Sequence, residues 1–248
     1  MGEPVSIDRR AWMTVLDHIE SNLLDGTLAP GDHLPSERQL ASDLGVGRSS
    51  VREALRVLEV LGLVRTQVGS GPGAGAIIIA APGGGMSALM RLQVAASGFA
   101  VTDVVKTRLI LEGAVVDELA TRTDGESHGA AQFATASLHG AARLLDAMDE
   151  SGLTPGEFLA LDQQFHLTLA EATGNEVVAA MMAGLRSSIE GYVTAGSEAI
   201  NDWHSTAARL RQEHRGIVAA ISAGDALNAR TRIHNHISGY YAETHLGE

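Results

Sequence analysis

The chain has 248 residues, carries a formal net charge of −12 and contains no cysteine. Without cysteine, disulfides and thiolate metal sites are excluded. No run of about 18 uncharged apolar residues is present, so we expect no membrane-spanning helix and no membrane partner. Charged residues stand near the start, where a signal peptide needs an apolar stretch, and we therefore expect a cytoplasmic protein.

Residues 1–80 predict three helices followed by a β-hairpin. Apolar residues at helical spacing favour the first helix. Ser36 opens the second, and Gln39 three residues later completes a capping-box pattern. A glycine-rich turn then separates two short strands. The expected helices cover 8–26, 36–44 and about 48–61, and the expected strands cover 64–68 and 76–80. Three helices and a hairpin in this order predict a winged helix-turn-helix.

The segment 81–85, Ala-Pro-Gly-Gly-Gly, has the composition of a linker. Beyond it every segment has helical periodicity, with breaks at glycine-containing turns. The expected helices cover about 104–120, 129–149, 155–172, 175–195, 203–222 and 225–245. We therefore predict a mainly α chain, with a winged helix-turn-helix domain at 1–80 and an all-helical domain at 86–248.

The helix at 48–61 has the pattern of a recognition helix. Its apolar positions fall at i, i+4 and i+7 and should face the core: Val51, Leu55 and Leu58. Three arginines repeat every four residues on a different stripe: Arg48, Arg52 and Arg56. The first turn, 48–50, is expected at base edges, where arginine bonds guanine and serine donates to phosphate or base. Alternatively, the stripe is a solvated face or pairs with Glu53 and Glu59.

Charge is distributed unevenly along the chain. The overall net charge argues weakly against a nucleic-acid partner. Within 38–65, however, five arginines stand against three acidic residues, which gives a local charge of +2. DNA binding would therefore rest on this local arginine face, with the acidic remainder held away from the phosphates.

Residues 28–65, LAPGDHLPSERQLASDLGVGRSSVREALRVLEVLGLVR, closely resemble the N-terminal domain of GntR-family transcription regulators. One departure is Gly47, which stands where the family usually has a hydroxyl residue. The resemblance implies these DNA-contacting residues: Arg38, Arg48, Ser49, Ser50, Arg52 and Gly69. Because two recognition helices must enter successive major grooves, we expect a homodimer on a near-palindromic double-stranded DNA operator.

Four side chains of the C-terminal half have the types and spacing of a metal site. Asp162 and His166, at i and i+4, project from one face of a helix. With His214 and His236 from later helices, they could converge inside a bundle on one ion. His236 is favoured over His234 because isoleucines flank it on the apolar side. Imidazole and carboxylate ligands suit Zn, Ni, Mn or Fe. Alternatively, each histidine is an ordinary surface or core residue.

Residues 86–248 resemble the ligand-binding domain of the FadR subfamily, called FCD. The matching features are Arg108 with Glu112, Asp162 with His166, Gly174-Asn175, Glu213-His214-Arg215 and His236-Ile237. The resemblance implies an antiparallel helical bundle that holds a metal ion on Asp162 and the three histidines. It also implies that Arg108 helps to bind a carboxylate effector. The alternative for Arg108 is a salt bridge with Glu112, four residues away.

Together these patterns predict a ligand-responsive DNA-binding transcription regulator, a repressor rather than an enzyme, that binds a divalent metal ion and a small organic acid. Two alternatives remain. Three histidines, an aspartate and open metal positions could activate water in a metal-dependent hydrolase, although no HExxH motif or evident general base accompanies them. The ion itself could also be the signal that the regulator senses.

Overall fold

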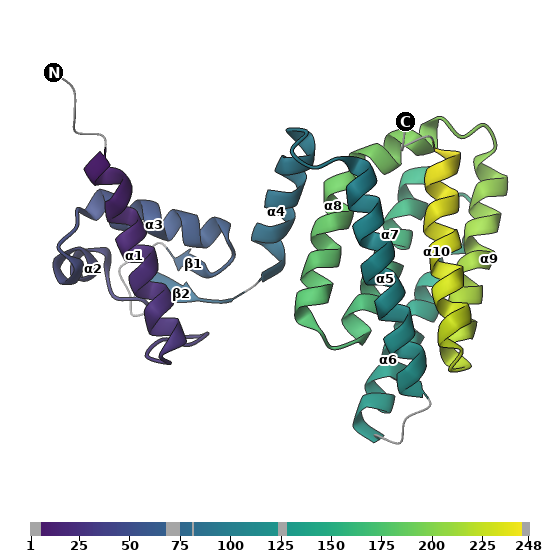
Figure 1. Cartoon of the computed structure of the whole chain (residues 1–248), viewed down its shortest axis with the longest axis horizontal. Helices are drawn as coiled ribbons and strands as arrows, with labels where there is room; N and C mark the ends of the chain where they lie inside the picture. Colours follow the sequence, from purple (N-terminus) through teal and green to yellow (C-terminus); the bar gives the residue numbers. More distant parts are fainter. Residues whose placement is uncertain (1–5, 68–74, 81, 124–127, 245–248) are drawn as a thin grey trace. The chain divides into compact units, whose positions relative to one another are not determined.

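The computed structural model describes residues 6–67, 75–80, 82–123 and 128–244 (Figure 1). The described chain divides into two compact units, Met1–Met86 and Ser87–Glu248. None of the described helices is both long and apolar enough to cross a membrane. The predicted fold class, a mainly α chain with a winged helix-turn-helix and a C-terminal helical bundle, is confirmed.

The first unit is the winged helix-turn-helix. Its elements are α1 (Ser6–Leu24), α2 (Glu37–Leu44), α3 (Arg48–Val60), β1 (Val64–Gln67) and β2 (Gly75–Ile78). Ser36 caps α2, since its hydroxyl accepts from the backbone N–H of Gln39 at 3.2 Å. The Gln39 amide donates to Asp43 at 2.6 Å instead of returning to the cap, so only half of the predicted capping box forms. At the other end, Gly45 takes a left-handed conformation with φ of 65°, which favours glycine.

The hairpin closes the core of this unit. β1 and β2 pair antiparallel with Val64 opposite Ile78, and both side chains are buried. The loop before α2 covers the free edge of β2, because Leu34 N–H donates to Ala76 O at 2.8 Å and Ile78 N–H donates to Asp32 O at 2.9 Å. Paired on both sides, β2 presents no open edge along these residues.

The second unit is a helical bundle that contains, among the described residues, six whole helices and most of a seventh, α4 (Pro82–Ala95), whose first five residues belong to the first unit. The six are α5 (Val101–Thr123), α6 (His128–Met148), α7 (Pro155–Ala172), α8 (Glu176–Glu198), α9 (Trp203–Ser222) and α10 (Ala226–Glu243). Residues 82–85 of the expected linker form the first turn of α4. Proline suits that position because its missing N–H would have no helical partner there. Figure 1 shows α5, α9 and α10 side by side, and α7 lies between α6 and α8.

Side-chain caps fix where the bundle helices begin. Thr154 and Glu157 form a complete capping box at α7. Asn175, Asp202 and Asp225 cap α8, α9 and α10 through their side-chain oxygens. Each cap satisfies backbone N–H groups that have no partner within the helix, and so stabilises the helix where it begins. The inward stripes include three histidines, and these build the site described below.

Substitution of a core leucine should destabilise the bundle strongly. Leu119 in α5 is fully buried, so Leu119→Ala should lower the free energy of unfolding by about 2–5 kcal/mol through lost burial and a residual cavity. Leu227→Ala is the matched control, since Leu227 on α10 is 77% exposed and its change should stay within about 0.5 kcal/mol. Urea unfolding followed by circular dichroism measures both, and equal losses would contradict the assignment of this core.

Candidate functional site

The predicted recognition helix α3 presents two different faces. Val51, Leu55 and Leu58 are buried, as their spacing predicts. Ser50 is also buried, at 2% exposed. It stands four residues before Ala54 and so belongs to the inward stripe, which the sequence analysis overlooked. Its side chain therefore offers little surface to DNA, and contact of Ser50 with DNA stays a prediction.

The other predicted DNA-contacting residues that the structure describes lie at the surface. Arg38 on α2 and Arg48 and Ser49 at the start of α3 are exposed. Gly69 lies outside the described residues. Gly47 provides no side-chain cap for α3, which fits its departure from the family pattern. The exposed arginines and the first turn of α3 therefore offer a solvent-accessible cationic surface.

Arg52 has a partner that the sequence did not predict. Its Nη2 lies 3.0 Å from Oε2 of Glu37 on α2, and its Nε lies 3.4 Å from Oε1 of the same carboxylate. Glu59, one of the predicted alternatives, instead accepts from the N–H and hydroxyl of Thr66. The Arg52 side chain stays 57% exposed, so its ion pair is solvated and contributes little to stability.

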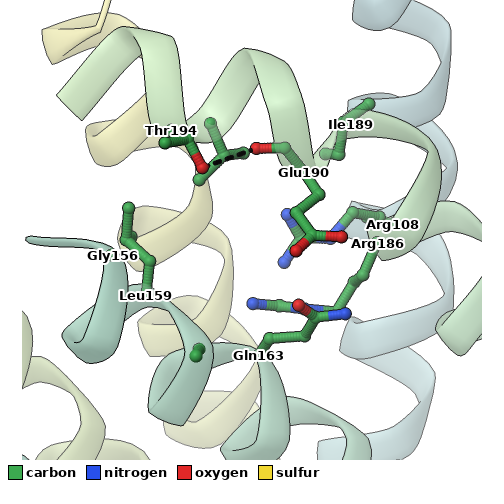
Figure 2. A pocket seen from close by; sticks show the side chains of 10 residues that line it. Arg108, Gly156, Leu159, Gln163, Arg186, Ile189, Glu190 and Thr194 are labelled. Carbon is green, nitrogen blue, oxygen red and sulfur yellow. Dashed lines mark hydrogen bonds between the residues drawn. The ribbon is translucent and has the colours of Figure 1, made fainter. Parts of the chain in front are cut away.

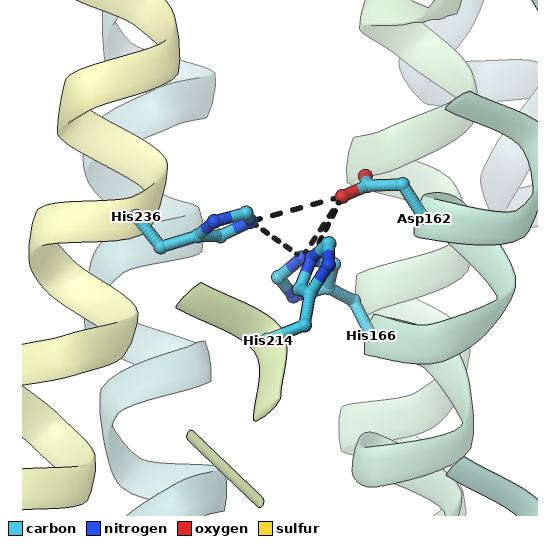
Figure 3. A group of neighbouring side chains, drawn as sticks. All are labelled: Asp162, His166, His214 and His236. Atoms are coloured by element: carbon cyan, nitrogen blue, oxygen red, sulfur yellow. Dashed lines mark hydrogen bonds and ion pairs between the residues drawn. The ribbon is translucent and has the colours of Figure 1, made fainter. Parts of the chain in front are cut away.

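Asp162, His166, His214 and His236 converge on one point inside the bundle (Figure 3). They come from α7, α9 and α10, and one ligand atom of each lies within 4.8 Å of the other three. Oδ1 of Asp162 is 3.0 Å from Nε2 of His214, 3.6 Å from Nε2 of His166 and 3.7 Å from Nε2 of His236. All three histidines are buried, whereas His234 is exposed.

A second set of contacts holds the far sides of these residues. Nδ1 of His166 contacts the Glu112 carboxylate on α5, and Nδ1 of His236 lies 2.9 Å from Oε2 of Glu213. Oδ2 of Asp162 accepts from Arg186 on α8. These contacts leave the Nε2 atoms and Oδ1 directed at the shared centre. Such outer partners are typical of metal ligands, because they fix the tautomer and orientation of each ring.

The protonation states of His214 and Asp162 suit a cation, whereas at His236 the neighbouring carboxylates Asp162 and Glu213 outweigh burial and raise the pKa. Burial, followed by the nearby charge of His236, lowers the pKa of His214 to about 3, so this imidazole is neutral. Burial alone would raise the pKa of Asp162, but Arg186 and His166 outweigh it and hold the pKa well below its usual value. Metal ions bind neutral imidazole and ionised carboxylate.

His214 supplies a direct test of fit. Neither of its ring nitrogens has a hydrogen-bond partner among the described residues. Its Nε2 lies close to Asp162 Oδ1 but outside hydrogen-bond geometry. A buried nitrogen without a partner costs about 1–3 kcal/mol. A cation at the shared centre would remove that cost at Nε2, so the residues present fit a metal ion.

Arg108 is buried beside this cluster. Its Nη2 and Nε donate to Oε1 of Glu112 at 2.7 and 2.9 Å, and its Nη1 donates to the Tyr241 hydroxyl at 3.0 Å. The salt bridge named as the alternative for Arg108 is therefore present. Arg108 also lines two cavities. One of them is lined by Asp162 and His236 as well, and Figure 2 shows the other. Among the described residues, one N–H on each terminal nitrogen of the Arg108 guanidinium has no acceptor.

Arg186 is the residue that the sequence analysis missed. It lines the same two cavities as Arg108 and bonds the predicted metal ligand Asp162. One signal was present: Arg186 is the sole charged residue between Glu176 and Glu190, in an otherwise apolar and small-residue stretch. A buried charge in such a stretch requires a partner.

Residues 13–72 match the family of bacterial regulatory proteins called gntR, and residues 103–239 match the FCD domain. The chain belongs to the GntR family with an FCD domain. It is 29% identical over 234 residues to the HTH-type transcriptional regulator LutR of Bacillus subtilis, covering 88% of this chain and 97% of that protein. It is 28% identical over 237 residues to the HTH-type transcriptional repressor NanR of Cronobacter sakazakii, covering 92% and 83%.

Among solved structures, a GntR protein of Streptococcus agalactiae has the same fold, with a TM-score of 0.58, 23% identity and coverage of 92% of this chain and 98% of that one. GntR proteins with FCD domains are DNA-binding transcription regulators that respond to small molecules. They are not enzymes, which argues against the hydrolase alternative.

Arg52→Ala should weaken specific DNA binding by about 1–3 kcal/mol if Arg52 reads a base. If it contacts phosphate alone, affinity should fall equally on all sequences and the salt slope should drop by about one. Arg56→Ala, which removes the same charge two turns from the start of α3, is the control and should cost less. Fluorescence anisotropy at several salt concentrations measures both. Unchanged affinity and salt slope in Arg52→Ala would place this residue outside the interface.

Proposed function

We propose that this GntR protein is a repressor whose helical bundle binds a divalent metal ion and, beside it, a small carboxylate effector. The observation that carries the proposal is the convergence of four ligand atoms from three helices on one buried centre. The nitrogens of His214, which lack partners among the described residues, support it. The relative NanR is a transcriptional repressor, which supports the sign of regulation.

Asp162, His166, His214 and His236 would hold the ion. With three imidazoles, one carboxylate and no sulfur, the ligands suit Zn, Ni, Mn or Fe. Four protein ligands leave two positions open when the ion is six-coordinate. The ion would supply positive charge and open positions for an oxygen ligand, and the chain would supply its orientation through Glu112, Glu213 and Arg186.

The effector would bind between the ion and Arg108. The cavity lined by Arg108 also reaches Asp162 and His236, so one small molecule could touch both. Arginine favours carboxylates because its planar donors match their two oxygens. An ion alone or an arginine alone orients a small acid poorly, whereas together they hold it from two sides. This neighbouring cavity favours an organic effector over the ion itself as the signal.

The DNA-binding surface would consist of Arg38, Arg48, Ser49 and Arg52, and Gly69 would add a contact from the wing. As a homodimer, the protein would place two α3 helices in successive major grooves of a near-palindromic operator. Effector binding would change DNA affinity by about 5- to 150-fold, the usual range of coupling between two sites.

His214→Ala should abolish metal binding and effector response while leaving basal DNA affinity near normal. His214 is the informative position, because His166 and His236 also contact Glu112 and Glu213, whereas His214 has no outer partner among the described residues. His204→Ala on the same helix is the control, since His204 is exposed.

Calorimetry with Zn²⁺ and a DNA-binding titration, each with and without organic acids, measure these effects. A His214→Ala protein that responds fully to acid with no metal bound would refute the metal's role. A wild-type protein that responds to the ion alone, and to no acid, would make the ion the signal.

A further inference from the structure

Arg186 is buried with part of its donor capacity unused. The residue is 7% exposed, its Nη2 donates to Oδ2 of Asp162, and its Nη1 makes no hydrogen bond among the described residues. The nearest carboxylate oxygen recorded for Nη1 is Oε1 of Glu112, at 3.8 Å. Glu112 Oε1 already accepts two hydrogen bonds from Arg108. A buried guanidinium nitrogen in this state is costly, and an incoming anionic oxygen would satisfy it.

Two cavities share Arg108 and Arg186 in their linings. Both guanidinium groups, with Leu159 and Val193, line each of them. One cavity, of about 30 Å³, continues to Asp162 and His236 of the cluster. The other, of about 60 Å³, continues to Gln163 and Thr194 (Figure 2). Since one water requires roughly 10–15 Å³ on this measure, both admit polar groups of a few atoms. A ligand with two polar ends would place one end in each.

The buried charges of the site set the charge of that ligand. Arg108 and Arg186 contribute two positive charges, and Glu112 and Asp162 contribute two negative ones, with side chains 4–13% exposed. These four cancel. Glu213, which contacts Nδ1 of His236, is only half-buried and shares Arg209 with Glu243, and Glu190, which lines the cavity of Figure 2, is exposed to water, so neither is counted among the buried charges. A divalent ion on neutral histidines would therefore bring the buried site to a net charge of +2.

A net buried charge is unfavourable until a counter-charge accompanies it. A monocarboxylate would leave one positive charge uncompensated. A dicarboxylate would neutralise both, and its second group would meet the unused Nη1 of Arg186. Charge balance and the position of the unsatisfied nitrogen thus favour the same ligand class.

We propose that the effector is a small dicarboxylate dianion, with one carboxylate between the ion and Arg108 and the other on Arg186. This inference rests on the metal and carboxylate site proposed above and names the class of acid that fills it. Arg186 is then the residue that selects dianions over monoanions.

The test compares acids that differ by one charge and little else. Calorimetry on the Zn²⁺-loaded full chain would use malonate, succinate and glutarate, each beside its monoamide. At least one dicarboxylate should bind about 10- to 100-fold more tightly than its own monoamide, the range expected for one charged hydrogen-bonded pair. In Arg186→Gln that ratio should fall close to one.

Because Arg186 also holds Asp162, the ratio is measured at saturating Zn²⁺, with bound metal quantified in each variant. Arg186→Lys, which keeps the charge but loses the planar donors, should retain part of the preference. Equal binding of each matched pair would overturn the dianion inference and leave the proposed function intact. A preference that persists in Arg186→Gln would overturn the role of Arg186. Binding of none of the six acids to metal-loaded wild type would overturn both the inference and the carboxylate effector.

Discussion

Charge burial is the constraint on which the helical bundle depends. Two guanidinium groups and two carboxylates are buried together between helices, and none of them could remain ionised there alone. Glu112 contacts Arg108 and His166, and Asp162 contacts Arg186 and the histidine cluster. Each carboxylate thus joins residues of different helices. Loss of one partner would leave a buried charge without compensation, so the network fixes the relative positions of α5, α7 and α8 as well as their chemistry.

The sequence predicts the elements well because the signals that define them are local. Apolar periodicity and the capping residues Asn175 and Asp225 lie within a few residues of the helices they define. The pair Asp162 and His166 follows from one helical turn. His214 and His236 could be assigned to the same site only from their residue type and from the family resemblance. No local pattern in the sequence indicates that α9 and α10 place them close to α7.

The contacts that the sequence did not predict join residues of different helices. Arg52 pairs with Glu37 because of the angle between α2 and α3, which no spacing within α3 contains. Arg186 bonds a residue twenty-four positions away, on another helix. The burial of Ser50, in contrast, follows from local periodicity, because Ser50 stands four residues before the buried Ala54. We expected the whole first turn of α3 to face DNA and so did not predict this burial. Residues 82–85 resemble a linker in composition, yet a helix tolerates glycine where neighbouring residues continue it.

The unsatisfied atoms of the site also bear on how a signal could arise. A ligand shifts an equilibrium by its differential affinity for two states and by nothing else. Nη1 of Arg186 and Nε2 of His214 lack partners among the described residues, so an ion and a dianion would gain contacts that these residues do not supply to each other. Residues of α8 and α9 would make these new contacts. Residues of α5, α7 and α10 would make the other contacts of the ion and the dianion. A filled site would therefore tie five helices together through one neutral cluster. A bundle that samples looser arrangements when the site is empty would shift toward the tied arrangement when the ion and the dianion bind. The free energy of that shift would be available to change DNA affinity.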